Sequence, residues 1–160
     1  MKRRSKISKN INQKSFYFED YLETHNSNGQ TVLIGDPTSM GDGIANNDSV
    51  FRSNILTVTE LTVWMMGISD LTGIKDFSSL EELYVASTSS YANQQLTSLD
   101  VSGLSNLNKL ICNSNSITSL NVDGCYNLGW LDCWNNQLTS INLLGCNQLN
   151  FLDIYDNPLI

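Results

Sequence analysis

The sequence is short of two features that enzymes and membrane proteins often require. It contains a single histidine, His25, which lies outside the repeats described below. A Ser–His–Asp or Cys–His catalytic arrangement therefore has no support from the repeats. No stretch approaches the roughly 18 uninterrupted apolar residues of a membrane-spanning helix. Catalysis of this type and membrane insertion are not expected.

Basic residues are scarce beyond residue 14. Six of the nine Lys and Arg residues lie in the first 14 positions, whereas all sixteen acidic residues lie from Glu19 onward. The body of the chain thus combines three basic with sixteen acidic residues, a net charge of −13. Because binding to a polyanion depends on neutralising phosphates with Lys and Arg, nucleic acid and anionic lipid are excluded as partners of this body.

The basic head, residues 1–14, has the charged start of a secretory signal but not the rest of one. No apolar core of about 7–15 residues follows the charges, so the chain shows no signal peptide. We interpret the head as a disordered or misassigned extension. An arm for nucleic acid or an anionic surface, and a targeting segment, are the alternatives.

A phrase of four residues recurs at a constant interval along the second half of the chain. Copies begin at Leu96, Ile117 and Leu138, and Leu159-Ile160 begins another, which defines a 21-residue period. A repeat of roughly 20–29 residues with this rhythm of apolar positions is typical of a leucine-rich-repeat solenoid. Because the last copy stops at Ile160, we expect a repeat domain that lacks a C-terminal cap, as in a fragment or a truncated reading frame.

Between these phrases, rows of the form L-x-x-L-x-[CI]-x-x-N-x-[LI] predict the strands. Clear rows start at Leu107, Leu128 and Leu149, and weaker ones at Val58 and Leu80. Stacked rows pair through their backbones as parallel strands, which predicts a curved parallel sheet of about five rows. Ser87–Gln95 exceeds the period by about six residues and predicts a protruding loop.

The chain divides into three parts. Residues 1–14 are the basic extension, residues 15–54 an N-terminal cap and residues 55–160 the repeat domain. In the cap, residues 15–23 predict a short helix with Ser15 as N-cap and with Phe18, Tyr21 and Leu22 on one face. Residues 26–54 are rich in Gly, Asn, Asp and Ser and predict loops. A cap is needed because a terminal repeat must shield the end of a continuous apolar core.

The four cysteines and the repeated asparagines take fixed phases of the repeat. Cys112 and Cys133 lie one period apart, as do Cys125 and Cys146, each in an apolar slot. We interpret them as buried thiols, since zinc sites use close Cys pairs that this sequence lacks. One Asn recurs per row, at 115, 136 and 157. An inward carboxamide there can satisfy backbone groups that the turn would bury unpaired.

These motifs resemble a known family. The rows match the leucine-rich-repeat consensus, and Leu96–Gly103 and Leu131–Ser140 resemble the 21-residue repeats of secreted and surface proteins of the Bacteroidetes, which are similar to internalin-type short repeats. Gly67–Ile74 resembles the first repeat of that group, and Phe18–Leu22 its cap. The resemblance implies a solenoid of the α/β horseshoe class, mostly β here, with a short helical cap. It also implies a bacterial extracellular or cell-surface protein that binds macromolecules and has no catalytic residues.

The outward strand positions form columns across neighbouring rows, about 4.8 Å apart. On the last two rows these columns bring together aromatic rings and carboxylates. The candidate ligand-binding residues of this concave face are Trp130, Asp132, Trp134, Phe151, Asp153 and Tyr155. Aromatic residues concentrate the binding energy of interfaces, and rings beside carboxylates also suit sugars. The alternative is ladder packing between strands without any ligand.

Two further patterns carry little chemistry. Asp132 and Asp153 would face the same way on neighbouring strands, but an open sheet face gives no environment to separate their pKa values as acid–base catalysis requires. Asp42–Asp48 superficially resembles a calcium loop but lacks oxygen ligands at alternate positions and the closing Glu. We therefore predict no enzyme, no cofactor and no metal site.

The sequence thus predicts a non-catalytic recognition module that binds protein or glycan through the concave face. The alternative is a structural spacer, a fragment of a larger bacterial surface protein with no ligand of its own. End-to-end association through the uncapped C-terminal repeat is a further expectation.

Overall fold

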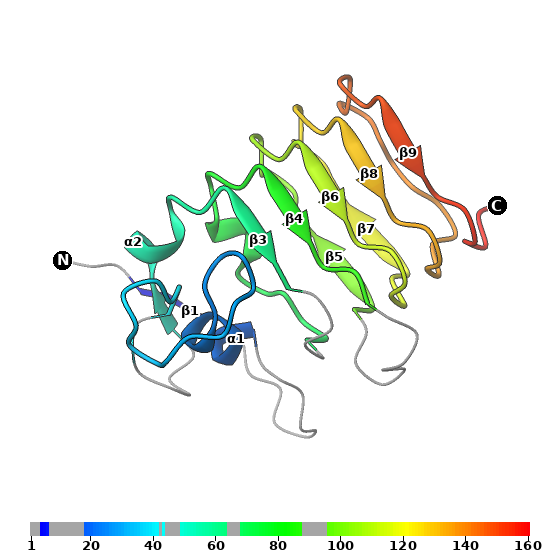
Figure 1. The fold of residues 1–160 in the computed structure, drawn as a ribbon. Helices are drawn as coiled ribbons and strands as arrows, with labels where there is room; N and C mark the ends of the chain where they lie inside the picture. Colours follow the sequence, from blue (N-terminus) through cyan, green and yellow to red (C-terminus); the bar gives the residue numbers. More distant parts are fainter. Residues whose placement is uncertain (1–3, 7–17, 42, 44–48, 64–67, 88–95) are drawn as a thin grey trace.

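The computed structural model of the protein describes residues 4–6, 18–41, 43, 49–63, 68–87 and 96–160. The predicted protruding loop lies outside these residues except for Ser87, and so do Ser15 and most of the segment 42–48. The predicted solenoid of 21-residue turns is confirmed (Figure 1).

Five parallel strands form the main sheet in the order β3-β4-β6-β8-β9. The strands are β3 Glu60–Thr62, β4 Glu82–Tyr84, β6 Lys109–Ile111, β8 Trp130–Asp132 and β9 Phe151–Asp153. Each central leucine pairs in register with the next, from Leu61 on β3 to Leu152 on β9. The sequence-based expectation of about five stacked rows is therefore correct. Each strand is short because every turn of the solenoid must also return to the start of the next row.

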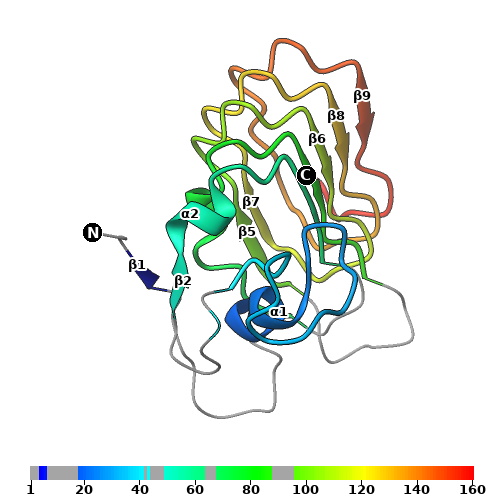
Figure 2. The same ribbon diagram turned by 60° about the vertical axis from the view of Figure 1, so that its left-hand side comes forward.

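A second, smaller sheet lies on the side of the core opposite to the main sheet (Figure 2). It pairs β5, Ser98–Asp100, with β7, Ser119–Asn121, in parallel. The repeated phrases that mark the period supply these strands, which the sequence analysis did not assign. Leu99 and Leu120 point into the core while their neighbours are exposed, the alternation expected of a strand with one buried face.

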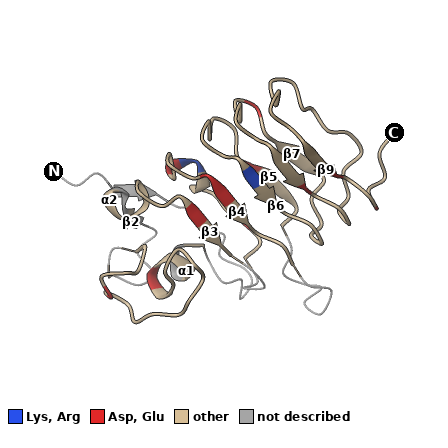
Figure 3. Ribbon diagram, turned by 45° about the horizontal axis from the view of Figure 1, so that its top comes forward, with Lys and Arg blue, Asp and Glu red and all other residues tan. Residues whose placement is uncertain are grey.

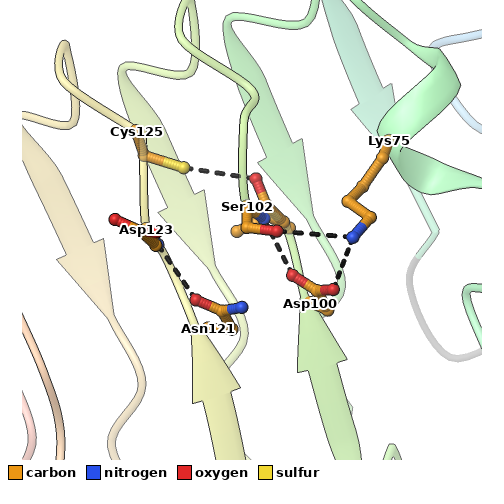
Figure 4. A network of polar contacts seen from close by, with 7 residues as sticks. Lys75, Asp100, Ser102, Asn121, Asp123 and Cys125 are labelled. Atoms are coloured by element: carbon orange, nitrogen blue, oxygen red, sulfur yellow. Dashed lines mark hydrogen bonds and ion pairs between the residues drawn. The ribbon is translucent and has the colours of Figure 1, made fainter.

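Polar side chains fix the turns that follow these two strands (Figure 4). Asp100 accepts a hydrogen bond from the N–H of Ser102 at 3.0 Å, and Asn121 accepts one from the N–H of Asp123 at 3.1 Å. The ammonium group of Lys75 lies 2.6 Å from the other carboxylate oxygen of Asp100. Because both partners are about half exposed, this ion pair contributes little to stability.

The core is a stack of apolar side chains between the two sheets. The central leucines of the first four rows, Leu61, Leu83, Leu110 and Leu131, are fully buried. On the end strand β9 the equivalent Leu152 is 40% exposed. All four cysteines are free thiols inside this core. The interpretation of the cysteines as buried hydrophobic residues is confirmed.

The inward asparagines satisfy buried backbone groups, as predicted, and they also join neighbouring turns. Asn136 accepts a hydrogen bond from the N–H of Ile117 at 2.9 Å and donates to the carbonyls of Cys112 and Cys133 at 3.1 and 3.0 Å. Asn115 makes the same kind of contacts one row earlier, and Asn157 one row later. Each carboxamide thus satisfies buried backbone groups of two adjacent rows.

The N-terminal cap covers the edge of the first row. Helix α1 is Phe18–Thr24, and the predicted start at Ser15 lies outside the described residues. Phe18, Tyr21 and Leu22 are buried on one face as expected. The hydroxyl of Tyr21 donates to the carbonyl of Thr62 on β3. The N–H of Thr62 donates to the carbonyl of Ser27 at 3.1 Å. The cap therefore satisfies edge groups of β3 that would otherwise lack a strand partner.

Short elements complete the N-terminal region. They are β1 Arg4–Lys6, β2 Ser49–Phe51, α2 Arg52–Ile55 and the 3₁₀ helix η1 Ile74–Asp76. Strand β1 pairs with β2 in an antiparallel register. These three residues belong to the basic head, residues 1–14, which the sequence analysis interprets as a disordered or misassigned extension. Within the segment 26–54, which was expected to form loops, residues 26–40 form turns as predicted, but β2 and most of α2 are regular elements that were not predicted.

Candidate functional site

The strand register places the predicted site residues on the outward face of the main sheet, which we call the sheet face. Trp130 pairs with Phe151, and Asp132 with Asp153, across β8 and β9. On β8, Trp130 and Asp132 flank the inward Leu131, and on β9, Phe151 and Asp153 flank Leu152. Because side chains alternate along a strand, the four flanking residues point away from the core. The columns predicted from the sequence therefore exist for these four residues.

The rings of Trp130 and Phe151 stack on each other. Their centroids lie 3.7 Å apart and their planes are inclined by 13°. Trp130 keeps 38% of its surface exposed. The stack therefore provides both the ladder packing named as the alternative and an exposed aromatic surface.

Trp134 and Tyr155 lie just beyond the carboxyl ends of β8 and β9. The N–H of Ser114 donates to the carbonyl of Trp134 at 3.0 Å, and the N–H of Asn135 donates to the carbonyl of Tyr155 at 2.9 Å. These bonds continue the stacking of the rows past the strands. Tyr155 is 79% exposed, whereas Trp134 is half-buried. Trp64, which holds the equivalent position of the first row in the sequence, lies outside the described residues.

The two carboxylates have different surroundings. Burial raises the pKa of Asp132, the N–H of Trp134 lowers it in part, and the charge of Asp153 raises it. The Oδ1 atom of Asp132 is buried and has no hydrogen-bond partner among the described residues. Asp153 accepts the N–H of Tyr155 at 3.1 Å. The position of Asp132 in the fold thus disfavours the charged form of its carboxyl group.

Sequence reasoning did not assign three residues that the structure adds to this surface. The ammonium group of Lys109 on β6 lies 5.1 Å from the ring centroid of Tyr84 and 5.6 Å from that of Trp130. It is also 3.9 Å from a carboxylate oxygen of Glu82. The Tyr84 hydroxyl is the main cause that raises the pKa of Lys109, with the charge of Glu82 adding to it. Lys109 therefore contacts both a carboxylate on the preceding row, Glu82, and a ring on the following row, Trp130.

The signal for these residues was present in the sequence. Glu60, Glu82, Lys109, Trp130 and Phe151 form one column of the predicted sheet, but spacing alone does not show which neighbours touch. Figure 3 shows acidic residues on β3 and β4 and a basic residue on β6. The column of Glu60, Glu82, Lys109, Trp130 and Phe151 thus changes from charged on its first three rows to aromatic on its last two.

Other reactive residues are buried in the fold. Burial raises the pKa of Cys125 and of Cys133 to about 12, and that of Cys112 well above its usual value. His25 is buried and stacks on Tyr21 with the ring centroids 4.2 Å apart. Within the described parts of the chain, no group of three or more His, Cys, Asp or Glu side chains is placed to hold a metal ion. In the same parts, no helix has the length and apolar character to cross a membrane.

Comparison with known proteins supports the repeat architecture. No protein-family model and no curated protein matches the sequence. Among solved structures, the chain is similar to the functional domain of InlJ from Listeria monocytogenes, which includes a cysteine ladder. The identity is 29% and the TM-score 0.59 over 70% of this chain, but only 24% of the InlJ chain is covered. Together with the solenoid of 21-residue turns, this likeness supports an internalin-like repeat protein.

Proposed function

We propose that this protein is a non-catalytic recognition module that binds another macromolecule, a protein or a glycan, through the sheet face. Its binding residues would be Trp130, Asp132, Trp134, Phe151, Asp153 and Tyr155. The observation that carries the proposal is the exposed stack of Trp130 on Phe151. Exposed aromatic surface of this kind concentrates binding energy.

The surroundings of the stack favour a protein partner. Lys109 and Glu82 lie on one side of it, and Asp132 and Asp153 lie beside it on the same strands. An aromatic centre with a polar, charged rim is the usual arrangement of a protein–protein interface. The proposal includes an extracellular or cell-surface location, which the resemblance to secreted repeat proteins supports.

The experiment compares a variant that removes two aromatic side chains of the sheet face with a control variant that removes an exposed tyrosine elsewhere. Arrays of extracellular proteins and of oligosaccharides are probed with the wild type, with a Trp134→Ala/Tyr155→Ala variant and with Tyr126→Ala. Tyr126 is 62% exposed and lies in the turn after β7, away from the sheet face. We expect a saturable ligand that the double variant loses and Tyr126→Ala keeps, with all variants showing the far-ultraviolet circular dichroism of the wild type.

The alternative is a spacer without a ligand. It is favoured by the same ring stack, since rings that bury each other stabilise the sheet without any partner. A spacer predicts that no array member binds saturably. The proposed surface is rejected if the double variant loses no saturable ligand that the wild type binds.

A further inference from the structure

A polar groove of about 460 Å³ lies where the strands of the main sheet begin. Two columns of residues line it. The first column is Asn106, Asn127 and Gln148, and the second is Glu81, Asn108, Gly129 and Asn150. We call it the amide groove, because five of its seven lining residues carry a carboxamide.

The repeat builds the amide groove in the same way as it builds the sheet. Residues 106 and 108 flank the buried Leu107, and the two following rows repeat this arrangement one and two periods later. The N–H of Gly129 donates to the carbonyl of Asn108 at 2.8 Å, and the N–H of Asn150 to that of Gly129 at 2.9 Å. Successive residues of each column, which we call its rungs, are therefore stacked about 4.8 Å apart, like the strands that follow them.

Gly129 leaves a gap in the second column, between the amides of Asn108 and Asn150. A methyl group at this position would lie 3.4 Å from Nδ2 of Asn150 and 3.5 Å from Nδ2 of Asn108. Gly129 is not among the glycines with positive φ, so the backbone does not require glycine there. Glycine without such a need costs stability relative to alanine. The missing side chain serves to leave room between Asn108 and Asn150.

Most of the amides are not committed to the fold. Asn106 donates to the carbonyl of Ser78 at 3.0 Å, and Asn108 reaches the carbonyl of Asn127 at 3.4 Å. The side chains of Asn127, Gln148 and Asn150 make no hydrogen bond to any group in the described part of the chain. Their donors and acceptors are therefore available to a ligand.

We propose that the amide groove is a second binding site, separate from the sheet face, and that it takes an uncharged oligosaccharide. A carboxamide both donates and accepts hydrogen bonds, as sugar hydroxyl groups do. Among the residues that the structure describes, Glu81 is the only charged one that lines the groove. The described lining thus offers no cation to neutralise a phosphate, sulfate or sugar acid.

The spacing of the rungs distinguishes a sugar from an extended peptide. A peptide strand advances about 3.3–3.4 Å per residue, whereas the rungs repeat every ~4.8 Å. The backbone groups of a peptide crossing the rows would therefore fall out of step with the amides. A sugar chain carries several hydroxyl groups on each unit and does not depend on such a match.

The test uses side-chain amide NMR signals of the full chain. Maltohexaose, cellohexaose, xylohexaose and chitohexaose are titrated, with sialyllactose and a heparin hexasaccharide as charged probes and a Ser/Thr-rich hexapeptide as the extended peptide. We expect saturable shifts of the carboxamide signals of Asn127 and Asn150 with at least one neutral sugar. The two charged probes and the peptide should leave them unchanged.

Variants then locate the site. Gly129→Ala fills the gap, and Asn150→Ala removes an exposed amide that supports nothing else; each should weaken sugar binding at least tenfold. Gln137→Ala, an exposed amide outside the groove, and Trp134→Ala/Tyr155→Ala should bind as the wild type does. The proposal is overturned if no neutral sugar shifts these signals, if a charged probe or the peptide does so instead, or if Asn150→Ala retains full affinity. A loss caused by the sheet-face variant would assign the sugar to that surface and likewise reject the groove.

Discussion

The indole of Trp130 on β8 lies nearly parallel to the phenyl ring of Phe151 on β9, with the centroids 3.7 Å apart. The two residues are register partners on neighbouring rows. The ammonium group of Lys109 on β6, the row before β8, lies 5.6 Å from the centroid of the indole. Three consecutive rows are thus joined on the sheet face by one cation and two rings, in addition to their backbone bonds.

Phe151→Ala should lower the free energy of unfolding by about 1 kcal/mol, since a stacked aromatic pair contributes about 0.5–1.5 kcal/mol beyond the area it buries. Urea unfolding followed by circular dichroism measures the change. Tyr126→Ala, which removes an exposed ring, is the matched control and should change stability little. Equal effects of the two substitutions would show that the stack does not stabilise the sheet.

Asn136→Ala should cost about 3–5 kcal/mol, because an unsatisfied buried polar group costs about 1–3 kcal/mol and this side chain serves three backbone groups. Asn157→Ala removes the same contacts on the half-buried end row and should cost less. Urea midpoints of both variants check the order. A larger loss for Asn157→Ala would contradict the account of the asparagine ladder.

Asp132→Asn should stabilise the protein at pH 7, because the neutral amide removes a negative charge that burial disfavours. The fold raises the pKa of Asp132, chiefly through burial, so folding favours the protonated acid. Wild-type stability is therefore lost as pH rises from the unfolded value, 3.8, through the raised folded value. The neutral amide avoids this loss.

The advantage of Asp132→Asn should accordingly vanish at pH 3 and reach its full size by pH 7. Unfolding curves at a series of pH values measure it. Asp156→Asn, at an exposed position, is the control and should show no such trend. A stability difference independent of pH would mean that the charge of Asp132 is not the cause.

The four thiols should be nearly unreactive in the folded protein at pH 8. Thiolate is the reactive form, and burial raises the pKa of Cys125 and Cys133 to about 12. Labelling with Ellman's reagent should be slow without denaturant and should reach four thiols in guanidinium chloride. Cys146, the most exposed of the four, should react first. Rapid labelling of Cys112 in the native state would contradict the burial of this thiol.

The period of the repeat was enough to predict the main sheet, because each row must bury its leucines and pair its backbone with the next row. It also placed the cysteines and asparagines inward, since each holds one phase of the repeat. The smaller sheet of β5 and β7 was missed for a physical reason. Its phrase of Leu, Thr and Ser alternates too briefly to distinguish a strand from a turn.

The candidate surfaces were predictable only in part. Alternation showed that Trp130, Asp132, Phe151 and Asp153 point outward, but not that two of the rings stack or that one oxygen of Asp132 is buried. One column of the groove, Asn106, Asn127 and Gln148, carries one amide per repeat in the sequence, yet nothing in that spacing shows a cavity. The absence of a side chain at Gly129 leaves space between Asn108 and Asn150, which are lining residues of the same groove.

The sequence by itself determined that the chain forms a solenoid, which residues point inward and which share a column. These properties follow from the period of the repeat and from the twofold alternation of a strand, both of which are local. Only the tertiary structure decided which outward groups touch, which polar atoms lose their partners and where space remains. Those properties depend on distances between neighbouring turns, and such distances are set by the packing of the whole stack.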